Sequence, residues 1–249
     1  MSPYRIERPF RRAIRTAASA VAALTLLLGW SAATGSTAYA QEPAAATAPT
    51  TLSGKVVQVR GGNVIYSSGG IRCTVGFNAR TSATFFGLVS GRCAQGTSNW
   101  YADAALSVFV GTTAGSSFPG NDYALIRYIN SSTVSFPGEV ALGGGGNQDI
   151  TGAANPTVGQ SLCHTGRTTG VHCGTVTGVN LTVNYPEGSV SGLFRSNICS
   201  EPGDAGGPAF SGTTALGIIV ASSGNCSSGG VTYYQPVVEW LSVYGLSLY

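Results

Sequence analysis

The glycine-rich stretch C-S-E-P-G-D-A-G-G-P-A-F, at 199–210, has the form of a tight turn that holds a reactive side chain at its centre. The residue at that centre is Ala205, whose methyl group has no reactive atom. Two other stretches carry ionisable groups, because Arg92 lies in F-F-G-L-V-S-G-R-C and Asp122 lies in G-N-D-Y-A-L-I-R-Y. Together they offer a carboxylate, a permanent cation and backbone N–H groups, which can stabilise negative charge.

Short β-type runs must position these groups, since β-branched and aromatic segments bounded by Gly, Asn, Ser or Pro recur along the chain. In residues 71–78 apolar and polar positions alternate strictly, which predicts a half-buried strand. One helix is predicted near the C-terminus, where Pro236 can start it and Gly245 can end it. The pattern predicts an all-β barrel or sandwich of about 190 residues. The other predicted strands are 63–66, 84–90, 106–111, 123–129, 171–185, 190–196 and 208–221.

The N-terminus has the pattern of a secretory signal peptide over residues 1–40. An arginine-rich region precedes an apolar run at 17–28, and Ala38-Tyr39-Ala40 matches an A-x-A cleavage site. The apolar run is too short to span a membrane, which argues against an anchor. Residues 41–60 read as a short linker or tail and residues 61–249 as the folded domain. We therefore expect a secreted, extracellular protein with no membrane contact after signal cleavage.

The positive charge of the chain belongs to the targeting segment. Five arginines and one glutamate lie in the first 40 residues, so cleavage after Ala40 would change the formal net charge from +3 to −1. The remaining chain gives no electrostatic reason to expect a nucleic acid or an anionic membrane as partner. Charged residues are only 9% of the chain, well below the usual quarter or so. The surface must then consist mostly of Gly, Ser, Thr and Asn.

The six cysteines, an even number in an exported chain, indicate disulfides. Their spacing alone leaves every pairing open. No C-x-x-C motif occurs, and His164 and His172 merely adjoin cysteines, so we expect no metal site and no cofactor.

In their order and spacing, the three stretches resemble the chymotrypsin-fold, trypsin-like serine proteases, and within them the bacterial branch of streptogrisins and α-lytic protease. Further matching stretches are Y-S-S-G-G-I-R-C-T-V-G-F-N, G-R-T-T-G-V-H-C-G-T-V and S-G-N-C-S-S-G-G, and the resemblance covers the chain from about Gly61 to Tyr249. It implies two six-stranded antiparallel β-barrels with the active cleft between them, to which the predicted helix adds a short C-terminal element. It also implies the disulfides Cys73–Cys93, Cys163–Cys173 and Cys199–Cys226.

The chemistry of that family needs a serine nucleophile, a histidine that takes its proton and an aspartate that orients the histidine. Here Asp122 matches the aspartate, Arg92 stands at the histidine position and Ala205 stands at the serine position. A methyl group cannot attack a carbonyl, and a guanidinium with a pKa above about 12 cannot accept a proton. Losing triad members costs roughly a million-fold in turnover. The implied oxyanion hole, from the N–H groups of Gly203 and Ala205, leaves only on the order of a thousand-fold over water.

The substrate-binding strand departs from the family pattern as well, because Val220-Ala221-Ser222 replaces S-G-G. Side chains therefore occupy positions where glycines leave the specificity pocket open. We also expect Arg92 and Asp122 to form an ion pair in place of the His–Asp pair, since an unpartnered buried carboxylate would be costly.

No other residue is expected to rescue the catalytic site. His164 and His172 are predicted to be surface or loop histidines beside the Cys163–Cys173 bridge. Ser90 is predicted to be a hydrogen-bonding serine at a strand end rather than a displaced nucleophile.

These departures favour a protease homologue without peptidase activity, a monomer that uses the inherited cleft to bind a peptide, a protein or a small molecule. A second hypothesis is a repurposed, non-hydrolytic enzyme for a small metabolite, in which Arg92 and the oxyanion hole stabilise negative charge and Asp122 is the base. A cleft filled by side chains would exclude it. A third is an ordinary serine endopeptidase, which serine-directed phosphonates would label.

Overall fold

A computed structural model describes residues 56–249. The signal peptide expected over 1–40 and most of the expected linker lie outside the described residues. The fold begins before the expected domain boundary at residue 61. The strand β1 (Val57–Gln58) pairs in parallel with β9 (Val134–Ser135), so this part of the expected linker belongs to the fold. Within the described part of the chain, no helix is long and apolar enough to cross a membrane.

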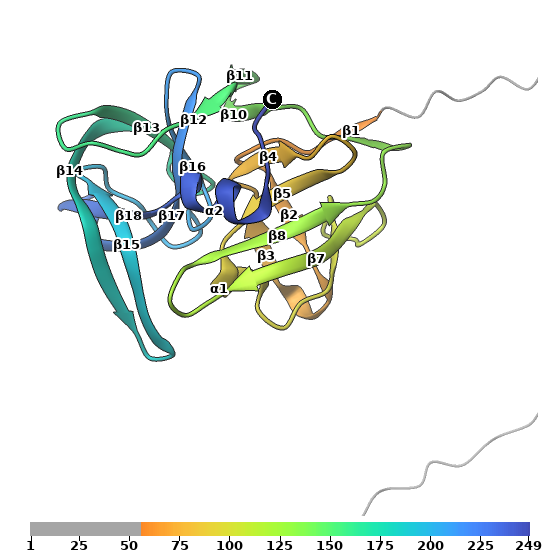
Figure 1. The fold of residues 1–249 in the computed structure, drawn as a ribbon, viewed down its shortest axis with the longest axis horizontal. Coiled ribbons are helices and arrows are strands. Elements are labelled where there is room, and N and C mark those ends of the chain that lie inside the picture. Colours follow the sequence, from red (N-terminus) through yellow and green to blue (C-terminus); the bar gives the residue numbers. More distant parts are fainter. Residues whose placement is uncertain (1–55) are drawn as a thin grey trace, which may run out of the picture. The chain divides into compact units, whose positions relative to one another are not determined.

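Two curled, antiparallel sheets form the domain, as the resemblance implied (Figure 1). The N-terminal sheet has seven strands in the order β3-β2-β6-β7-β8-β5-β4. Its elements are β2 (Val64–Tyr66), the 3-10 helix η1 (Ser68–Gly70), β3 (Arg72–Thr74), β4 (Phe77–Arg80), β5 (Phe85–Val89), β6 (Asn99–Tyr101), β7 (Phe109–Ser117) and β8 (Tyr123–Tyr128).

The C-terminal sheet has the order β12-β17-β16-β13-β14-β15-β18 and closes through a β17–β18 pairing. The six antiparallel strands form the closed ring that the resemblance implied, and β12 adds a seventh strand, parallel to β17. A hairpin of β10 (Glu139–Gly143) and β11 (Gly146–Asp149) precedes them. The strands are β12 (Gly152–Ala153), β13 (Ser161–Gly166), β14 (Gly170–Tyr185), β15 (Gly188–Ser196), β16 (Pro208–Ser211), β17 (Thr214–Asn225) and β18 (Gly229–Pro236).

Three predicted strands differ from the structure. The strand predicted at 71–78 is divided between β3 and β4 at Gly76, where a side chain would collide with Ile218 of the other sheet. The strand predicted at 106–111 begins only at Phe109, because Leu106 has a left-handed φ of 56° in a turn. The strand predicted at 208–221 is two strands, which reverse direction through a turn at Gly212, φ 56°.

The predicted C-terminal helix is confirmed as α2 (Val237–Tyr244), with Pro236 at its N-cap and Gly245 in the left-handed region after its end. A second short helix, α1 (Gly91–Ala94), was not expected. Its N-cap is Ser90, whose hydroxyl accepts a hydrogen bond from the Cys93 N–H at 3.2 Å. This helix matters because it carries Arg92.

One apolar cluster joins the two sheets and thereby fixes the position of α1 relative to the glycine-rich turn. It combines Phe77 and Leu88 from the N-terminal sheet with Ile218 from β17 and Trp240 from α2. Full burial of each such side chain contributes about 2 kcal/mol. All three expected disulfides are formed: Cys73–Cys93, Cys163–Cys173 and Cys199–Cys226.

Candidate functional site

Asp122 lies immediately before β8 and is only 1% exposed. The Ser90 hydroxyl and the backbone N–H of Arg92 both donate to its Oδ1 at 2.8 Å. Burial raises the pKa of the Asp122 carboxyl above its ordinary value, and these two hydrogen bonds oppose the rise. The carboxylate is therefore held by the chain itself and is closed to a ligand.

The Arg92 guanidinium does not pair with Asp122, so the expected ion pair is wrong. Its Nη2 lies 3.7 Å from Glu187 Oε1, and its Cζ lies 5.0 Å from the centre of the Tyr185 ring. The side chain is 48% exposed. Asp122 already accepts two hydrogen bonds, so its carboxylate does not need a further partner. Burying the Arg92 guanidinium beside it would remove water from the guanidinium without a compensating gain. An exposed arginine over an aromatic ring keeps its water and gains a cation–π contact.

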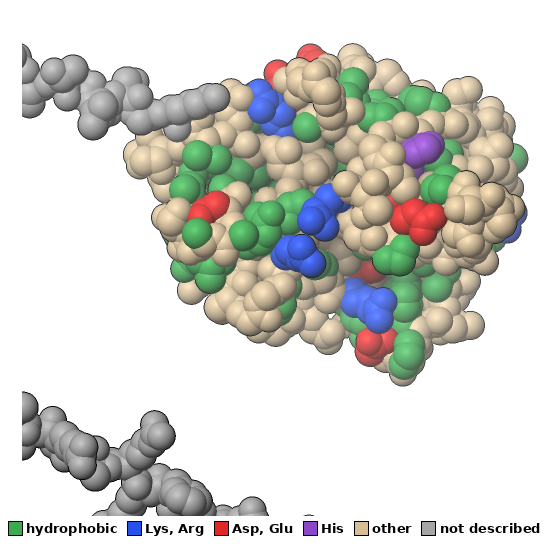
Figure 2. All heavy atoms as spheres, turned by 180° about the vertical axis from the view of Figure 1, so that it is seen from behind, with side chains coloured by type: hydrophobic (Ala, Val, Ile, Leu, Met, Phe, Trp, Pro, Cys, Tyr) green, Lys and Arg blue, Asp and Glu red, His purple; other side chains and the backbone are tan. Residues whose placement is uncertain are grey.

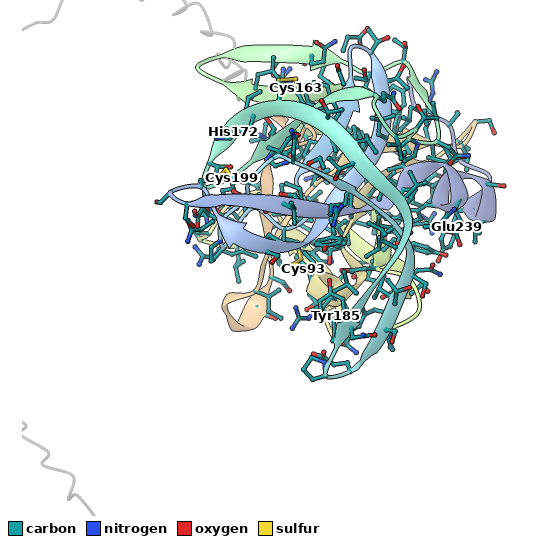
Figure 3. All side chains as sticks on the ribbon, turned by 90° about the vertical axis from the view of Figure 1, so that its left-hand side faces the viewer. Cys93, Cys163, His172, Tyr185, Cys199 and Glu239 are labelled. Atoms are coloured by element: carbon teal, nitrogen blue, oxygen red, sulfur yellow. A yellow bond between two sulfur atoms is a disulfide. The ribbon has the colours of Figure 1, made fainter. Side chains whose placement is uncertain are left out.

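Tyr185 connects Arg92 to β17, the strand expected to bind substrate. It lies on the long β14–β15 hairpin, toward its free end (Figure 3). Its hydroxyl donates to the backbone carbonyl of Val220 at 3.0 Å, and burial raises the pKa of this phenol to about 12. The hairpin therefore touches both α1 and β17.

The turn around Ala205 is anchored from below by Asp204, which is fully buried. Its carboxylate accepts hydrogen bonds from the Thr168 N–H at 2.7 Å, the Thr169 hydroxyl at 2.8 Å and the Glu201 N–H at 2.8 Å. Gly203 has a φ of 104°, which a side chain rarely adopts. The turn is thus rigid although its central residue is a methyl-bearing alanine.

The N–H groups of Gly203 and Ala205 are the expected oxyanion-hole donors. Neither donates a hydrogen bond to any acceptor in the described part of the chain, and both residues are exposed. Backbone donors without acceptors at a surface turn are available to an anion or a carbonyl oxygen.

Two pockets meet at Ala205. The first has a volume of about 140 Å³, so the side chains of the expected specificity strand do not close it. It is lined by Ser200, Glu201, Pro202, Gly203, Ala205, Ile219, Val220, Ala221 and Ser222. The second has a volume of about 160 Å³. It is lined by Val64, Arg72, Cys73, Thr74, Cys93, Arg167, Gly203 and Ala205. The cleft is open on both sides of the alanine.

The second pocket contains two residues that the sequence analysis did not single out, Arg72 and Arg167. Both occur in stretches that carry the family resemblance, I-R-C-T and G-R-T-T-G. In a chain in which only 9% of the residues are charged, each arginine of the described domain was a signal for an anion contact. Glu187 and Tyr185 were missed because only the folded hairpin brings them to Arg92.

Neither histidine lies at the cleft, and His164 is not a surface or loop residue as expected. It is fully buried in β13, where its Nδ1 lies 2.8 Å from the Tyr234 hydroxyl. Burial lowers the pKa of the His164 imidazole to about 4. His172 lies in β14, where its Nε2 donates to the Thr169 carbonyl at 3.1 Å. Ser90 is a buried N-cap, in agreement with its predicted hydrogen-bonding role.

Comparison with known proteins gives a consistent result. The Trypsin family profile matches residues 93–243. Serine protease 2 of Streptomyces fradiae is 50% identical over 176 residues, which cover 70% of this chain and 100% of that protein. Streptogrisin-A of Streptomyces griseus is 43% identical over 196 residues, 78% of this chain and 63% of that protein.

Solved structures agree with the sequence comparison. Alpha-lytic protease homolog N4 is 56% identical with a TM-score of 0.73, covering 78% of this chain and all of that one. A glutamic acid specific serine protease is 44% identical with a TM-score of 0.72, covering 77% of this chain and all of that one. The profile, the identities and the shared fold together establish that the chain belongs to the trypsin family.

Proposed function

We propose that the protein is an exported peptide-binding member of the trypsin family that does not hydrolyse peptide bonds. The observation that carries this proposal is the methyl group of Ala205 on an otherwise intact, anchored turn between two open pockets. Hydrolysis through an acyl intermediate needs an oxygen or sulfur nucleophile at this position, and a methyl group supplies none.

The surroundings of Ala205 supply no substitute for the missing base. Arg92 is permanently charged and is turned toward Glu187. Asp122 is buried and hydrogen-bonded within the chain. A general base must reach the proton that it removes, so this arrangement also weighs against a repurposed, non-hydrolytic enzyme with Asp122 as its base.

Peptide binding is supported by an open strand edge beside the first pocket. β17 pairs with β16 only as far as Ile218, whereas it pairs with β18 as far as Asn225. Residues 220–222 therefore have one edge without a partner strand in the described part of the chain, although the Val220 carbonyl already accepts a hydrogen bond from the Tyr185 hydroxyl. An extended peptide can add to such an edge through backbone hydrogen bonds and place a side chain in the adjoining pocket. Export is supported by the three disulfides, which persist in oxidising compartments.

The test compares the native chain with the double variant Arg92→His/Ala205→Ser. We expect the native protein to release no chromophore from a mixed set of peptidyl p-nitroanilides and to resist labelling by a serine-directed phosphonate. The double variant is expected to gain both activities, because the anchored turn and the open pockets are already in place. The single variant Ala205→Ser is the control for a nucleophile without a base. Hydrolysis by a native sample free of contaminating protease would contradict the proposal if it were lost in Gly203→Ala, because Gly203 lines both pockets at Ala205.

A further inference from the structure

Three arginines stand at the cleft, but only one of them has an acidic partner. Arg92 pairs with Glu187, whereas no carboxylate of the described chain lies within 4.0 Å of the Arg72 or Arg167 guanidinium. Both of these residues are exposed and line the 160 Å³ pocket beside Ala205. Figure 2 shows Lys and Arg side chains near the middle of one face of the molecule. Two like charges that share a pocket repel each other unless an anion lies between them.

The Arg167 guanidinium lies close to the glycine-rich turn. Its Nη1 is 3.9 Å from the position that a Cβ atom on Gly203 would take. The pocket is therefore lined by two arginines and by the two residues, Gly203 and Ala205, whose backbone N–H groups lack acceptors in the described chain. Planar, multi-donor cations and fixed N–H groups are the donors that suit a carboxylate.

The acidic residues around the turn do not use these donors. Asp204 is buried and accepts hydrogen bonds from the Thr168 N–H, the Thr169 hydroxyl and the Glu201 N–H. Glu201 accepts a hydrogen bond from the Cys226 N–H at 2.8 Å through Oε1. The donors of the pocket thus remain open to a ligand.

The 160 Å³ pocket shares Gly203 and Ala205 with the pocket beside residues 220–222, so a peptide bound along that strand and continuing past Ala205 would enter it. If the peptide continued, neutral backbone amides would run between Arg72 and Arg167 and leave both charges unmatched. If it ended at Ala205, its carboxylate would meet both arginines and the two N–H groups. We propose that the cleft captures peptides by their free C-terminal carboxylate, with Arg72, Arg167 and the N–H groups of Gly203 and Ala205 as its donors. This inference rests on the proposed peptide-binding function.

The probes are fluorescein-labelled tetrapeptides, Ala-Ala-Pro-Xaa, with each of the twenty residues at the last position. Every sequence is made both as the free acid and as the C-terminal amide, and binding to the full chain is followed by fluorescence polarisation. We expect at least one acid to bind about tenfold or more tightly than its amide, because the amide removes a charge that carries several hydrogen bonds. Raising the salt concentration should weaken binding of the acid more than binding of the amide.

Variants assign the effect to the pocket. Arg72→Ala and Arg167→Ala are each expected to weaken binding of the acid about tenfold and to leave the amide unchanged, with partial recovery in Arg167→Lys. Arg127→Ala is the matched control, since Arg127 is also an exposed arginine but lines a different pocket.

The outcomes separate the two proposals. Equal affinity for acid and amide, or an equal loss in Arg127→Ala and Arg167→Ala, overturns carboxylate capture and leaves peptide binding standing. No binding of any peptide in either form overturns peptide binding in the cleft itself.

Discussion

Acidification from pH 7 to pH 4 should destabilise the protein through a single buried imidazole, that of His164. Burial lowers the pKa of this group from its ordinary value of 6.5 to about 4; the nearby Asp204 charge opposes the fall and His172 adds to it. At pH values between the native pKa of about 4 and the ordinary pKa of 6.5, His164 is protonated in the unfolded chain but not in the native chain. The free energy of unfolding therefore decreases as the pH falls through this window, and is unaffected by His164 above it.

The size of the effect follows from the difference in pKa. Each pKa unit corresponds to about 1.4 kcal/mol, so the fall from 6.5 to about 4 amounts to about 3 kcal/mol of lost stability at pH 4. The raised pKa of Asp122 acts in the opposite direction, because the native carboxyl binds a proton more readily than the unfolded one. Comparison with a His164 variant removes this common contribution.

Urea unfolding followed by tryptophan fluorescence, with the disulfides intact, measures the free energy of unfolding at each pH. We expect His164→Phe to lose about 3 kcal/mol less than the native protein between pH 7 and pH 4. The control His172→Gln should keep most of the native pH dependence, because His172 makes the smallest contribution to the lowered pKa of His164. Equal losses in the native protein and in His164→Phe would refute the reasoning, as would an NMR titration of the His164 ring with a midpoint near 6.5. The NMR measurement stands even if the phenylalanine variant fails to fold.

Two further predictions concern the packing of the cleft and of the sheets. Arg92→Ala should lower the free energy of unfolding by about 1 kcal/mol or less, because it removes only exposed contacts to Glu187 and Tyr185. A loss above about 3 kcal/mol in urea unfolding would instead indicate a buried ion pair with Asp122. Gly76→Ala should lower the free energy of unfolding by about 1–3 kcal/mol in the same assay, because the added methyl group would collide with Ile218. The control Gly152→Ala should be almost neutral, because no atom lies within 4 Å of the added methyl group. Equal losses in the two variants would contradict this account.

The fold could be predicted because its signals are local or carried by the family resemblance. Alternation at 71–78 and the Pro236 and Gly245 signals each specify an element within a few residues. The interruption at Gly76 could not be predicted, because the collision that requires glycine there involves Ile218, far along the chain. The helix α1 is too short to produce a periodic pattern.

The family resemblance assigned positions to the expected site, but the contacts of those residues could not be predicted. Motif spacing located Arg92, Asp122 and Ala205, yet opposite charges at matching positions wrongly suggested an ion pair. The sequence could not reveal that a main-chain N–H and the Ser90 hydroxyl satisfy Asp122, nor that the tip of the β14–β15 hairpin reaches Arg92. Such contacts depend on tertiary packing, which residue type alone does not encode.

The way in which Asp122 is held has a consequence for how this lineage can change. Its hydrogen bonds come from Ser90 and from the peptide group of residue 92, and every amino acid except proline offers that peptide N–H. The side chain at position 92 is thus free to vary without stranding a buried charge. Substitution of residue 92 therefore carries little folding penalty, and chains that differ at this position can accumulate as stable proteins.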